Sequence, residues 1–257
     1  MPELPDIEVF SSNLKSMLAG KKLTKIKIVN GKKLKDKPAA FKILDGKTVK
    51  NVYRSGKEIR FEFSEKLIMG IHLMLTGDLI PFEGENERKS TIAEMYFSNG
   101  MAIALTDRMK NAYVKLNPED KEGIDALDKN LNFKFLKNAL NRKTNIKNIL
   151  TDQGVIRGIG NGYSDEILWE TRISPFSVAN AIPDEKIKEL ALSIKKVLKN
   201  ATAKIRKNHP GLIHGEIKEY LNIHTKKKTH SPTGKPILQA DRGMLKTFYT
   251  DEQILYK

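Results

Sequence analysis

The stretch that decides the fold is residues 153–166, QGVIRGIGNGYSDE, in which a glycine-rich turn leads into a helical pattern. Glycine lets the backbone come close to a ligand, and the free amides at the start of a helix bind anions such as phosphate. We expect Gly160 and Asn161 to lie at such a site, with Asn161 as the helix N-cap whose side-chain amide also reaches the anion. Glu166, inside the helix, is expected to fix the turn. The stretch therefore predicts a phosphate-contacting turn within a helical domain.

Apolar residues recur at helical spacing on both sides of this turn. Helices are predicted over residues 134–141, 145–150, 163–171, 183–207 and 213–221. The preceding residues 119–133 are acidic and polar, which predicts a linker, and the helical domain is expected to span 134–224. The last residues, 225–257, become basic and rich in turn formers, and Ser231-Pro232-Thr233-Gly234 precedes two short strand candidates. This pattern indicates a β-hairpin.

Residues 1–118 have a different character. Ile7, Phe10, Leu14, Met17 and Leu18 lie at helical spacing and predict one helix over Asp6–Leu18. Alternating segments separated by turn signals such as Asn30-Gly31 and Ser55-Gly56 follow this helix. The predicted strands are Lys22–Val29, Thr48–Tyr53, Ile59–Phe63, Leu67–Leu73, Ile92–Ser98 and Ala102–Thr106. Such spacing is typical of an antiparallel β-sandwich or barrel, so the fold class is α+β with more than one domain.

The charge balance favours polyanionic partners. The 257 residues include 46 Lys+Arg and 31 Asp+Glu, a formal net charge of +15. Each phosphate that such a surface neutralises releases condensed counterions, which drives binding. The same surplus also fits ribosomal RNA or an acidic membrane surface, and a lysine-rich genome would raise it without any role in nucleic-acid binding.

Other features of the composition exclude several classes. Cysteine is absent, which excludes disulfides and thiolate metal sites. No apolar run is long enough to span a bilayer, and the start MPELPDIEVF carries acids where a signal peptide carries basic residues. We therefore expect a cytoplasmic protein that binds no membrane. We also expect it to be a monomer and to be associated with the nucleoid.

The chain start offers a nucleophile. Proline at position 2 is small enough for Met1 to be trimmed, which exposes a secondary amine. An α-amino group titrates near ~8, so a useful fraction is unprotonated at neutral pH. Attack of the Pro2 amine on the anomeric carbon of a sugar gives an iminium ion, an electron sink for elimination, and Glu3 can act as general acid. Met-Pro starts are common, however, so an ordinary start is the favoured interpretation of these residues when they are taken alone.

Residues 2–9, PELPDIEV, closely resemble the N-terminal signature of the formamidopyrimidine-DNA glycosylase/endonuclease VIII family. Residues 153–166 are similar to the helix–two-turn–helix element of the same family. The resemblance implies that Pro2 is the covalent nucleophile and Glu3 the adjacent acid/base. Asp6 stands where the family usually has glutamate.

Three further segments of the first domain bear on this resemblance. Arg54-Ser55-Gly56-Lys57 resembles a family turn whose lysine assists catalysis, a role that falls to Lys57. His72–Gly77, HLMLTG, resembles the segment that fills the gap left by a flipped nucleotide, and Leu75 takes the position of the wedge. Thr106–Asn111 matches its family loop poorly, because Met109 and Lys110 fall on the two arginines. The sequence therefore does not assign the residues that contact the base opposite the lesion, and this loop favours the endonuclease VIII type slightly.

The C-terminal segment departs from relatives that end in a four-cysteine zinc finger. Its frame is kept, but the positions of the metal ligands are occupied by His230, Thr233, Thr250 and Gln253. We therefore expect a zincless β-hairpin finger without metal. Its packing is expected to come from Ile237, Leu238, Phe248 and Tyr249. The fingertip arginine of the family falls on Leu245, and Arg242 or Lys246 is expected to take over its phosphate contact. A solvated basic tail remains an alternative for this segment.

Taken together, the resemblance implies a bifunctional DNA glycosylase/AP lyase of base-excision repair. It would excise oxidised bases from damaged double-stranded DNA through a Schiff base on Pro2, followed by β- and δ-elimination, with no cofactor. Two alternatives stay open. One is a lesion-binding protein of the same fold that has lost efficient excision, and the other is an RNA-binding protein built around the two-turn element.

Overall fold

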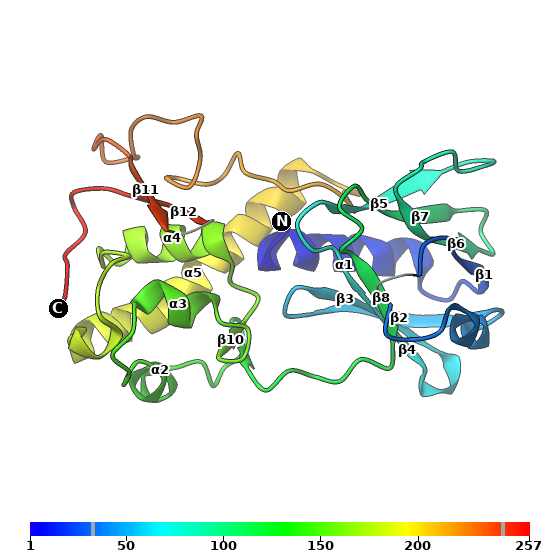
Figure 1. Cartoon of the computed structure of the whole chain (residues 1–257), viewed down its shortest axis with the longest axis horizontal. Helices are drawn as coiled ribbons and strands as arrows, with labels where there is room; N and C mark the ends of the chain where they lie inside the picture. The colour runs from blue at the N-terminus through cyan, green and yellow to red at the C-terminus, as the bar shows by residue number, and fades with distance from the viewer. Residues whose placement is uncertain (32–33, 243–244) are drawn as a thin grey trace. The chain divides into compact units, whose positions relative to one another are not determined.

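The computed structural model describes residues 1–31, 34–242 and 245–257 (Figure 1). The side chains of Arg242 and Leu245 lie outside the described part. The chain forms two compact units. The first comprises Met1–Pro2, Asp6–Asp120 and Arg206–Glu216, and the second comprises Glu3–Pro5, Lys121–Ile205 and Ile217–Lys257.

The first unit contains two antiparallel four-stranded sheets and most of helix α1 (Leu4–Leu18). One sheet has the order β1-β6-β7-β5 and the other the order β2-β3-β4-β8. The strands are β1 (Leu23–Ile28), β2 (Val49–Ser55), β3 (Glu58–Phe63), β4 (Ile68–His72), β5 (Gly77–Phe82), β6 (Thr91–Phe97), β7 (Ala102–Asp107) and β8 (Tyr113–Leu116). Short 3-10 helices lie at Pro38–Leu44 and Ser64–Lys66.

One apolar core joins α1 to both sheets. Phe10, Leu14 and Leu18 of α1 are fully buried in the same cluster as Phe61 of β3 and Leu105 of β7. Burial of each such side chain contributes roughly 2–3 kcal/mol, so the helical spacing seen in the sequence is explained by the face that α1 turns to this core. The predicted helix and the predicted antiparallel sheet domain are confirmed.

Strand β5 was not predicted from the sequence. It contains Pro81, which cannot donate a ladder hydrogen bond. The strand lies at the edge of its sheet, next to β7, and Pro81 is exposed there, so the missing N–H leaves no bond unmade inside the sheet.

The second unit is mainly helical. Its helices are α2 (Phe133–Ala139), α3 (Ile146–Thr151), α4 (Asn161–Glu170) and α5 (Asp184–Asn208), with a 3-10 turn at Ala179–Ala181. The side chains of Asn132 and Asn145 cap α2 and α3 by accepting from the amides of Phe135 and Lys147 at 3.1 and 2.9 Å. The amphipathic helix α5 buries one apolar face, which includes Ile187, Leu190, Ile194 and Leu198.

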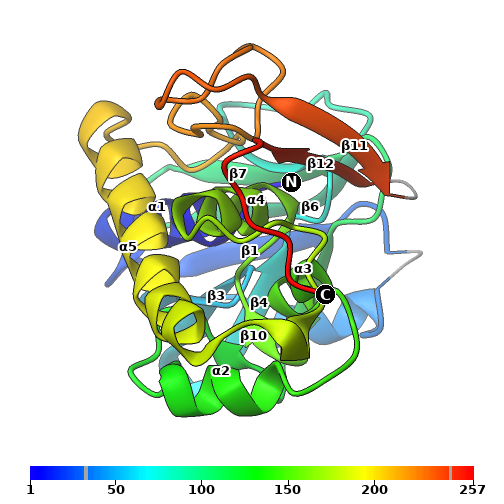
Figure 2. The same ribbon diagram turned by 90° about the vertical axis from the view of Figure 1, so that its left-hand side faces the viewer.

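Two small β elements complete this unit. Strands β9 (Ile124–Asp125) and β10 (Ile156–Arg157) pair in parallel, and β11 (Leu238–Arg242) and β12 (Leu245–Tyr249) form the expected antiparallel hairpin. The hairpin lies beside α4, as both ribbon views show (Figures 1 and 2). The helical domain with a C-terminal hairpin is therefore confirmed.

Two expectations for the helical part are wrong. Residues 213–221 form no helix. The preceding Gly211 and the internal Gly215 adopt positive φ, and the apolar side chains serve different cores: Ile213 belongs to the core of the sheets and Leu221 to that of the helices. The helical spacing was therefore not that of one helix face. Second, the N-cap of α4 is Gly160, and Asn161 is the first helical residue.

No helix among the described residues is long and apolar enough to cross a membrane.

Candidate active site

The chain start is held by an ion pair within the first unit. The Met1 ammonium lies 2.9 Å from Oε2 of Glu216, and Pro2 is buried next to it. The segment that carries Glu216 is itself fixed: the amide of Gly215 donates to Asp78 Oδ1 at 2.7 Å, and Asn13 of α1 donates to the carbonyl of Leu212 at 2.7 Å. No role could be assigned to Glu216 from the sequence, because its proximity to the chain start depends on the path of the segment after α5.

Glu3 is buried, and its carboxylate lies on the N-terminus of α4 within the second unit. It accepts from the amides of Gly160 at 2.6 Å, Gly162 at 2.8 Å and Tyr163 at 3.4 Å. The amides that the sequence assigned to a phosphate thus bind the chain's own carboxylate, which is stabilised there by the helix dipole. The amide of Gly160 is engaged in this contact.

The glycines of this turn make room for the chain start. A Cβ on Gly158 would lie 2.6 Å from Cδ1 of Leu4, and φ of Gly158 is +103°. A Cβ on Gly162 would lie 3.2 Å from Oε1 of Glu3. The amide of Leu4 also donates to the carbonyl of Gly158 at 3.1 Å. Gly158 therefore needs to be glycine, because its φ is positive and Leu4 packs against it, whereas a Cβ at Gly162 would require Glu3 to shift by a few tenths of an ångström.

Lys57 lies in the tight turn between β2 and β3, where Gly56 has a positive φ of 60°. Its side chain is buried. Arg54 at the end of β2 donates to Glu8 Oε2 of α1 at 2.8 Å and to the carbonyl of Gly56 at 3.1 Å. This arginine ties the Lys57 turn to α1, the helix that follows Pro2 in the chain.

Leu75 and Met109 are two large apolar side chains that remain exposed, by 57% and 51%. Leu75 lies in the turn between β4 and β5, and Met109 lies in the loop between β7 and β8, next to Lys110. Apolar side chains of this size normally lie in a core, and exposed ones that gather on a surface mark a binding surface.

Asp107 joins these two loops. Its buried carboxylate accepts from the hydroxyl of Thr76 and from the amides of Met109 at 3.0 Å, Asn111 at 2.7 Å and Ala112 at 2.7 Å. Burial alone would raise the pKa of Asp107, but the hydrogen bonds from Thr76 and the three amides outweigh burial, and the pKa is lowered. The role of Asp107 in holding both loops was not predicted from the sequence.

A buried charged cluster fixes the hairpin to the helices of the second unit. Asp165 of α4 pairs with Lys147 of α3 at 2.6 Å and with Nδ1 of His224 at 2.7 Å, and it accepts from the amide of Phe248 at 2.9 Å. Lys147 also donates to the hydroxyl of Thr247 at 3.0 Å. Neither Lys147 nor Asp165 was identified from the sequence. The carboxylate within the two-turn motif was the signal that could have identified Asp165.

Asn161 connects the two-turn element to the hairpin. Its Nδ2 donates to the carbonyl of Lys246 at 2.9 Å, and the Lys246 side chain is exposed. These two expected DNA-contacting residues are therefore brought together. The side chain of Arg242, the other candidate at the hairpin, lies outside the described residues.

The four positions that hold zinc in other fingers do not fit a metal here. Thr233 and Thr250 both donate to Oε2 of Glu252, at 2.7 and 3.1 Å. Gln253 accepts from the amide of Thr250 at 2.8 Å and donates to the carbonyl of Ile173 at 2.8 Å. Hydroxyl and amide groups are poor zinc ligands. Within the described ranges, no group of three or more His, Cys, Asp and Glu could hold a metal ion.

The expected packing of the hairpin is correct only in part. Phe248 is buried against His224, and Tyr249 contacts Phe176 edge-on with ring centroids 5.0 Å apart. Leu238, by contrast, is 41% exposed. Polar contacts around Asp165 and Glu252 hold the hairpin in addition to apolar packing.

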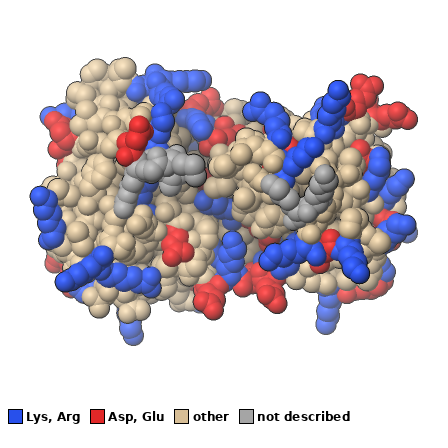
Figure 3. Space-filling view, in the orientation of Figure 1, with Lys and Arg blue, Asp and Glu red and all other residues tan. Residues whose placement is uncertain are grey.

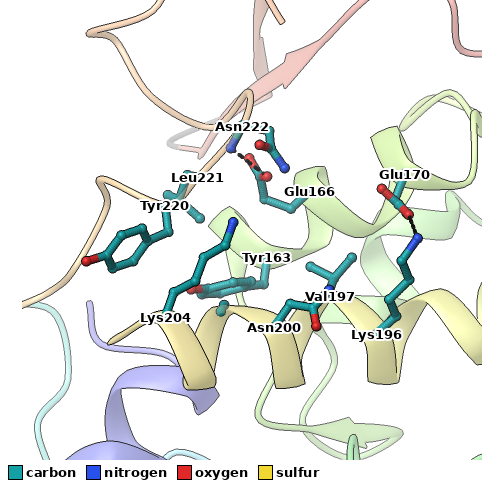
Figure 4. Close-up of a pocket in the computed structure, with 11 residues that line it drawn as sticks. Tyr163, Glu166, Glu170, Lys196, Val197, Asn200, Lys204, Tyr220, Leu221 and Asn222 are labelled. Atoms are coloured by element: carbon teal, nitrogen blue, oxygen red, sulfur yellow. Dashed lines mark hydrogen bonds and ion pairs between the residues drawn. The ribbon is translucent and has the colours of Figure 1, made fainter. Parts of the chain in front are cut away.

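Glu166 fixes the segment after α5, as Figure 4 shows for its bond to Asn222. Its carboxylate accepts from the amides of Asn222, Ile223 and His224 at 2.7, 2.8 and 2.8 Å. Burial raises the pKa of Glu166, although these amides act in the opposite direction. Glu166 lines a pocket of about 90 Å³ between α4, α5 and residues 220–222, and none of the predicted catalytic residues lines it.

The described surface is rich in cations. On the face shown in Figure 3, Lys and Arg side chains are spread over both units and are interspersed with fewer Asp and Glu side chains. This distribution is consistent with the net charge of +15 and with a polyanionic partner.

Comparison with known proteins identifies both parts of the chain. Residues 1–114 match the formamidopyrimidine-DNA glycosylase N-terminal domain, and residues 123–212 match the formamidopyrimidine-DNA glycosylase H2TH domain. The chain is 32% identical over 219 residues to the formamidopyrimidine-DNA glycosylase of Ligilactobacillus salivarius, covering 79% of this chain and 78% of that protein. It is 32% identical over 245 residues to the one of Protochlamydia amoebophila, covering 88% and 89%.

The fold is also that of solved structures. The Lactococcus lactis Fpg in complex with an abasic-site DNA superposes with a TM-score of 0.87 at 22% identity, covering 98% of this chain and 99% of that one. The chain therefore belongs to the formamidopyrimidine-DNA glycosylase family, the DNA glycosylases and AP lyases of base-excision repair.

Proposed function

We propose that this chain excises oxidised bases from duplex DNA and cleaves the resulting abasic strand, with the amine of Pro2 as nucleophile once Met1 is removed. Removal of Met1 converts the Pro2 nitrogen from a tertiary amide into a secondary amine that can form an iminium ion. The observation that carries the proposal is the ion pair of Arg54 with Glu8, which ties the Lys57 turn to the helix that follows Pro2. Two motif segments far apart in the sequence are thereby joined.

The proposed chemistry has three steps. The Pro2 amine attacks C1′ of the lesion nucleotide while Glu3 acts as general acid/base, and the base leaves. The iminium acidifies the hydrogens on C2′, so loss of a C2′ proton expels the 3′ phosphate (β-elimination). Loss of the C4′ proton then expels the 5′ phosphate (δ-elimination). Lys57 is proposed to act at the sugar as a cation near the phosphate, and no metal or organic cofactor takes part in these steps.

Access to C1′ requires the nucleotide to leave the base stack. Leu75 and Met109 are proposed to fill the space it leaves, because both are apolar, exposed and held on loops that share Asp107. An apolar plug compensates part of the cost of unstacking, a few kcal/mol per step.

Phosphates are proposed to contact Lys110 in the first unit, and Asn161, Arg242 and Lys246 in the second, whereas the amide of Gly160 is bonded to Glu3. The bond between Asn161 and the carbonyl of Lys246 supports a common phosphate site on these two elements. The protein would act on damaged double-stranded DNA in the cytoplasm, in association with the nucleoid of a bacterium.

A second candidate is a protein that binds lesions but excises slowly. Met109 and Lys110 in place of two arginines favour it, because methionine offers no donor to the opposite base and lysine is a point charge rather than a bidentate fork.

A cleavage panel separates these candidates. Duplexes that carry an oxidised purine, a formamidopyrimidine, an oxidised pyrimidine or an abasic site are incubated with the parent and with Pro2→Leu, whose large second residue retains Met1. The proposal expects strand cleavage by the parent and a loss of at least about 100-fold in Pro2→Leu. Equal cleavage of the abasic duplex by both proteins would exclude Pro2, and binding without cleavage by the parent would favour the second candidate.

A further inference from the structure

We propose that Glu216 is a further catalytic residue, which takes the proton from the Pro2 amine and then acts as the counterion of the iminium. This inference rests on the proposed role of Pro2. The observation behind it is the 2.9 Å ion pair between the chain-terminal ammonium of Met1 and Glu216 Oε2. The structure thus places a carboxylate against the charged end of the chain.

Trimming Met1 moves the amine by one residue only. The Met1 and Pro2 nitrogens are separated by three covalent bonds, so they lie at most about 4 Å apart. The Glu216 side chain is 29% exposed and can follow this shift, whereas its backbone is held by the bond between Gly215 and Asp78. The same carboxylate can therefore pair with the Pro2 ammonium.

The other carboxylate at the chain start has a different assignment. Both oxygens of Glu3 accept from amides at the N-terminus of α4. Other ionisable groups of the first unit close to Glu216 are His214, two residues before it in the chain, and Asp78, which accepts from the amide of Gly215. The chain-terminal ammonium pairs with Glu216.

The proton balance closes for an abasic site. The Pro2 ammonium gives one proton to Glu216, and the neutral amine attacks the C1′ aldehyde. The second N–H proton passes to the former carbonyl oxygen, giving a carbinolamine. Glu216 then returns its proton to that hydroxyl, water leaves, and the nitrogen lone pair forms the C=N bond of the iminium. The carboxylate is regenerated next to a cation, which stabilises charge that develops during the reaction.

The test is the rate at which borohydride traps the parent and Glu216→Gln on a duplex with a preformed abasic site, under single-turnover conditions between pH 6 and pH 8. Proton transfer by a positioned group contributes typically ~100-fold or more, so Glu216→Gln is expected to be at least about 100-fold slower at pH 7. Without the carboxylate the reaction needs amine that is already neutral, so its rate should rise roughly tenfold per pH unit below ~8, whereas the parent stays level.

Two further variants serve as controls. Glu216→Asp keeps the charge and is expected to retain most of the rate and the level profile. Glu83→Gln makes the same chemical change at an exposed position of the first unit and should behave as the parent. Affinity for a duplex with a tetrahydrofuran abasic analogue, which cannot form an iminium, should be equal in all four proteins if their folds are intact.

Different outcomes would overturn the role of Pro2 and the role of Glu216. Trapping of Glu216→Gln at the parent's rate and with a level pH profile would overturn the role of Glu216 and leave Pro2 as nucleophile. A parent that gives no adduct would overturn the role of Pro2, and that of Glu216 with it. Loss of tetrahydrofuran-duplex binding in Glu216→Gln together with a level, slowed profile in Glu216→Asp would also overturn it, because a structural role then explains the data.

Discussion

Replacement of Asp107 by alanine should destabilise the first unit and separate the two loops that carry Leu75 and Met109. The change removes the acceptor of one hydroxyl and three amides. The amide of Ala112 is the most costly to leave unpaired, because Ala112 is only 1% exposed, and a buried donor without a partner costs about 1–3 kcal/mol. Water can replace part of the remaining bonds, so the expected total is about 3 kcal/mol of unfolding free energy.

The assay is urea unfolding followed by circular dichroism, with excision measured on the same preparations. Asp107→Asn keeps the shape and one acceptor, so its loss should be intermediate. Excision is expected to fall more than affinity for an abasic analogue, because the loops fill the space of a flipped nucleotide in the account above. A loss below about 1 kcal/mol in Asp107→Ala, or equal losses in both variants, would refute the reasoning.

The pH dependence of the same site has a definite sign. Burial would raise the pKa of Asp107, yet its hydrogen bonds lower it below that of the unfolded chain. A depressed carboxyl pKa gives stability that is present at neutral pH and is lost as pH falls through the folded value, below ~3.9. The acid limb of the unfolding curve should therefore be shallower in Asp107→Asn than in the parent.

Three other outcomes are expected. Lys147→Met should lower the unfolding free energy of the second unit by about 3–5 kcal/mol, because it leaves the carboxylate of Asp165 buried without the lysine cation. Unfolding is followed by Trp169 fluorescence, and a change under about 1 kcal/mol would contradict a stabilising role of this ion pair. In the parent, burial raises the pKa of Glu166, so the folded state binds the proton more readily and stability should decline as pH rises above ~4.3. Glu166→Gln should remove this decline, and an unchanged pH profile of stability would contradict the prediction. Leu75→Ala should lower the single-turnover rate of excision of a paired lesion more than that of cleavage at an abasic site. Equal effects on both substrates would contradict the proposal that Leu75 fills the space of the flipped nucleotide.

The elements that follow one periodic pattern were predictable from the sequence. Helix α1 and the strands β1 to β4, β6 and β7 contribute apolar side chains to a single core, so their apolar spacing reports their structure directly. Strand β5 was not predicted, because Pro81 argues against a strand unless the position of that strand at the sheet edge is known. Residues 213–221 misled because their apolar side chains are divided between two cores.

The candidate site was predictable where a motif is local and not where it depends on distant contacts. Lys57 and Leu75 lie in turns next to the strands that position them, and their roles remain proposals. The glycines of residues 153–166 were read as a phosphate site, but their amides and their open space accommodate Glu3 and Leu4. Glu216 lies more than two hundred residues from Met1, so no pattern in the sequence pointed to their ion pair.

The most direct test of the central claim is the chemical location of the trapped adduct. The parent is reduced with borohydride on an abasic duplex, digested with protease and nuclease, and analysed by tandem mass spectrometry. We expect the sugar remnant to lie on the nitrogen of Pro2 in an N-terminal peptide that lacks Met1. An adduct on Lys57 or another lysine, or an unmodified N-terminal peptide that retains Met1 in trapped protein, would contradict it.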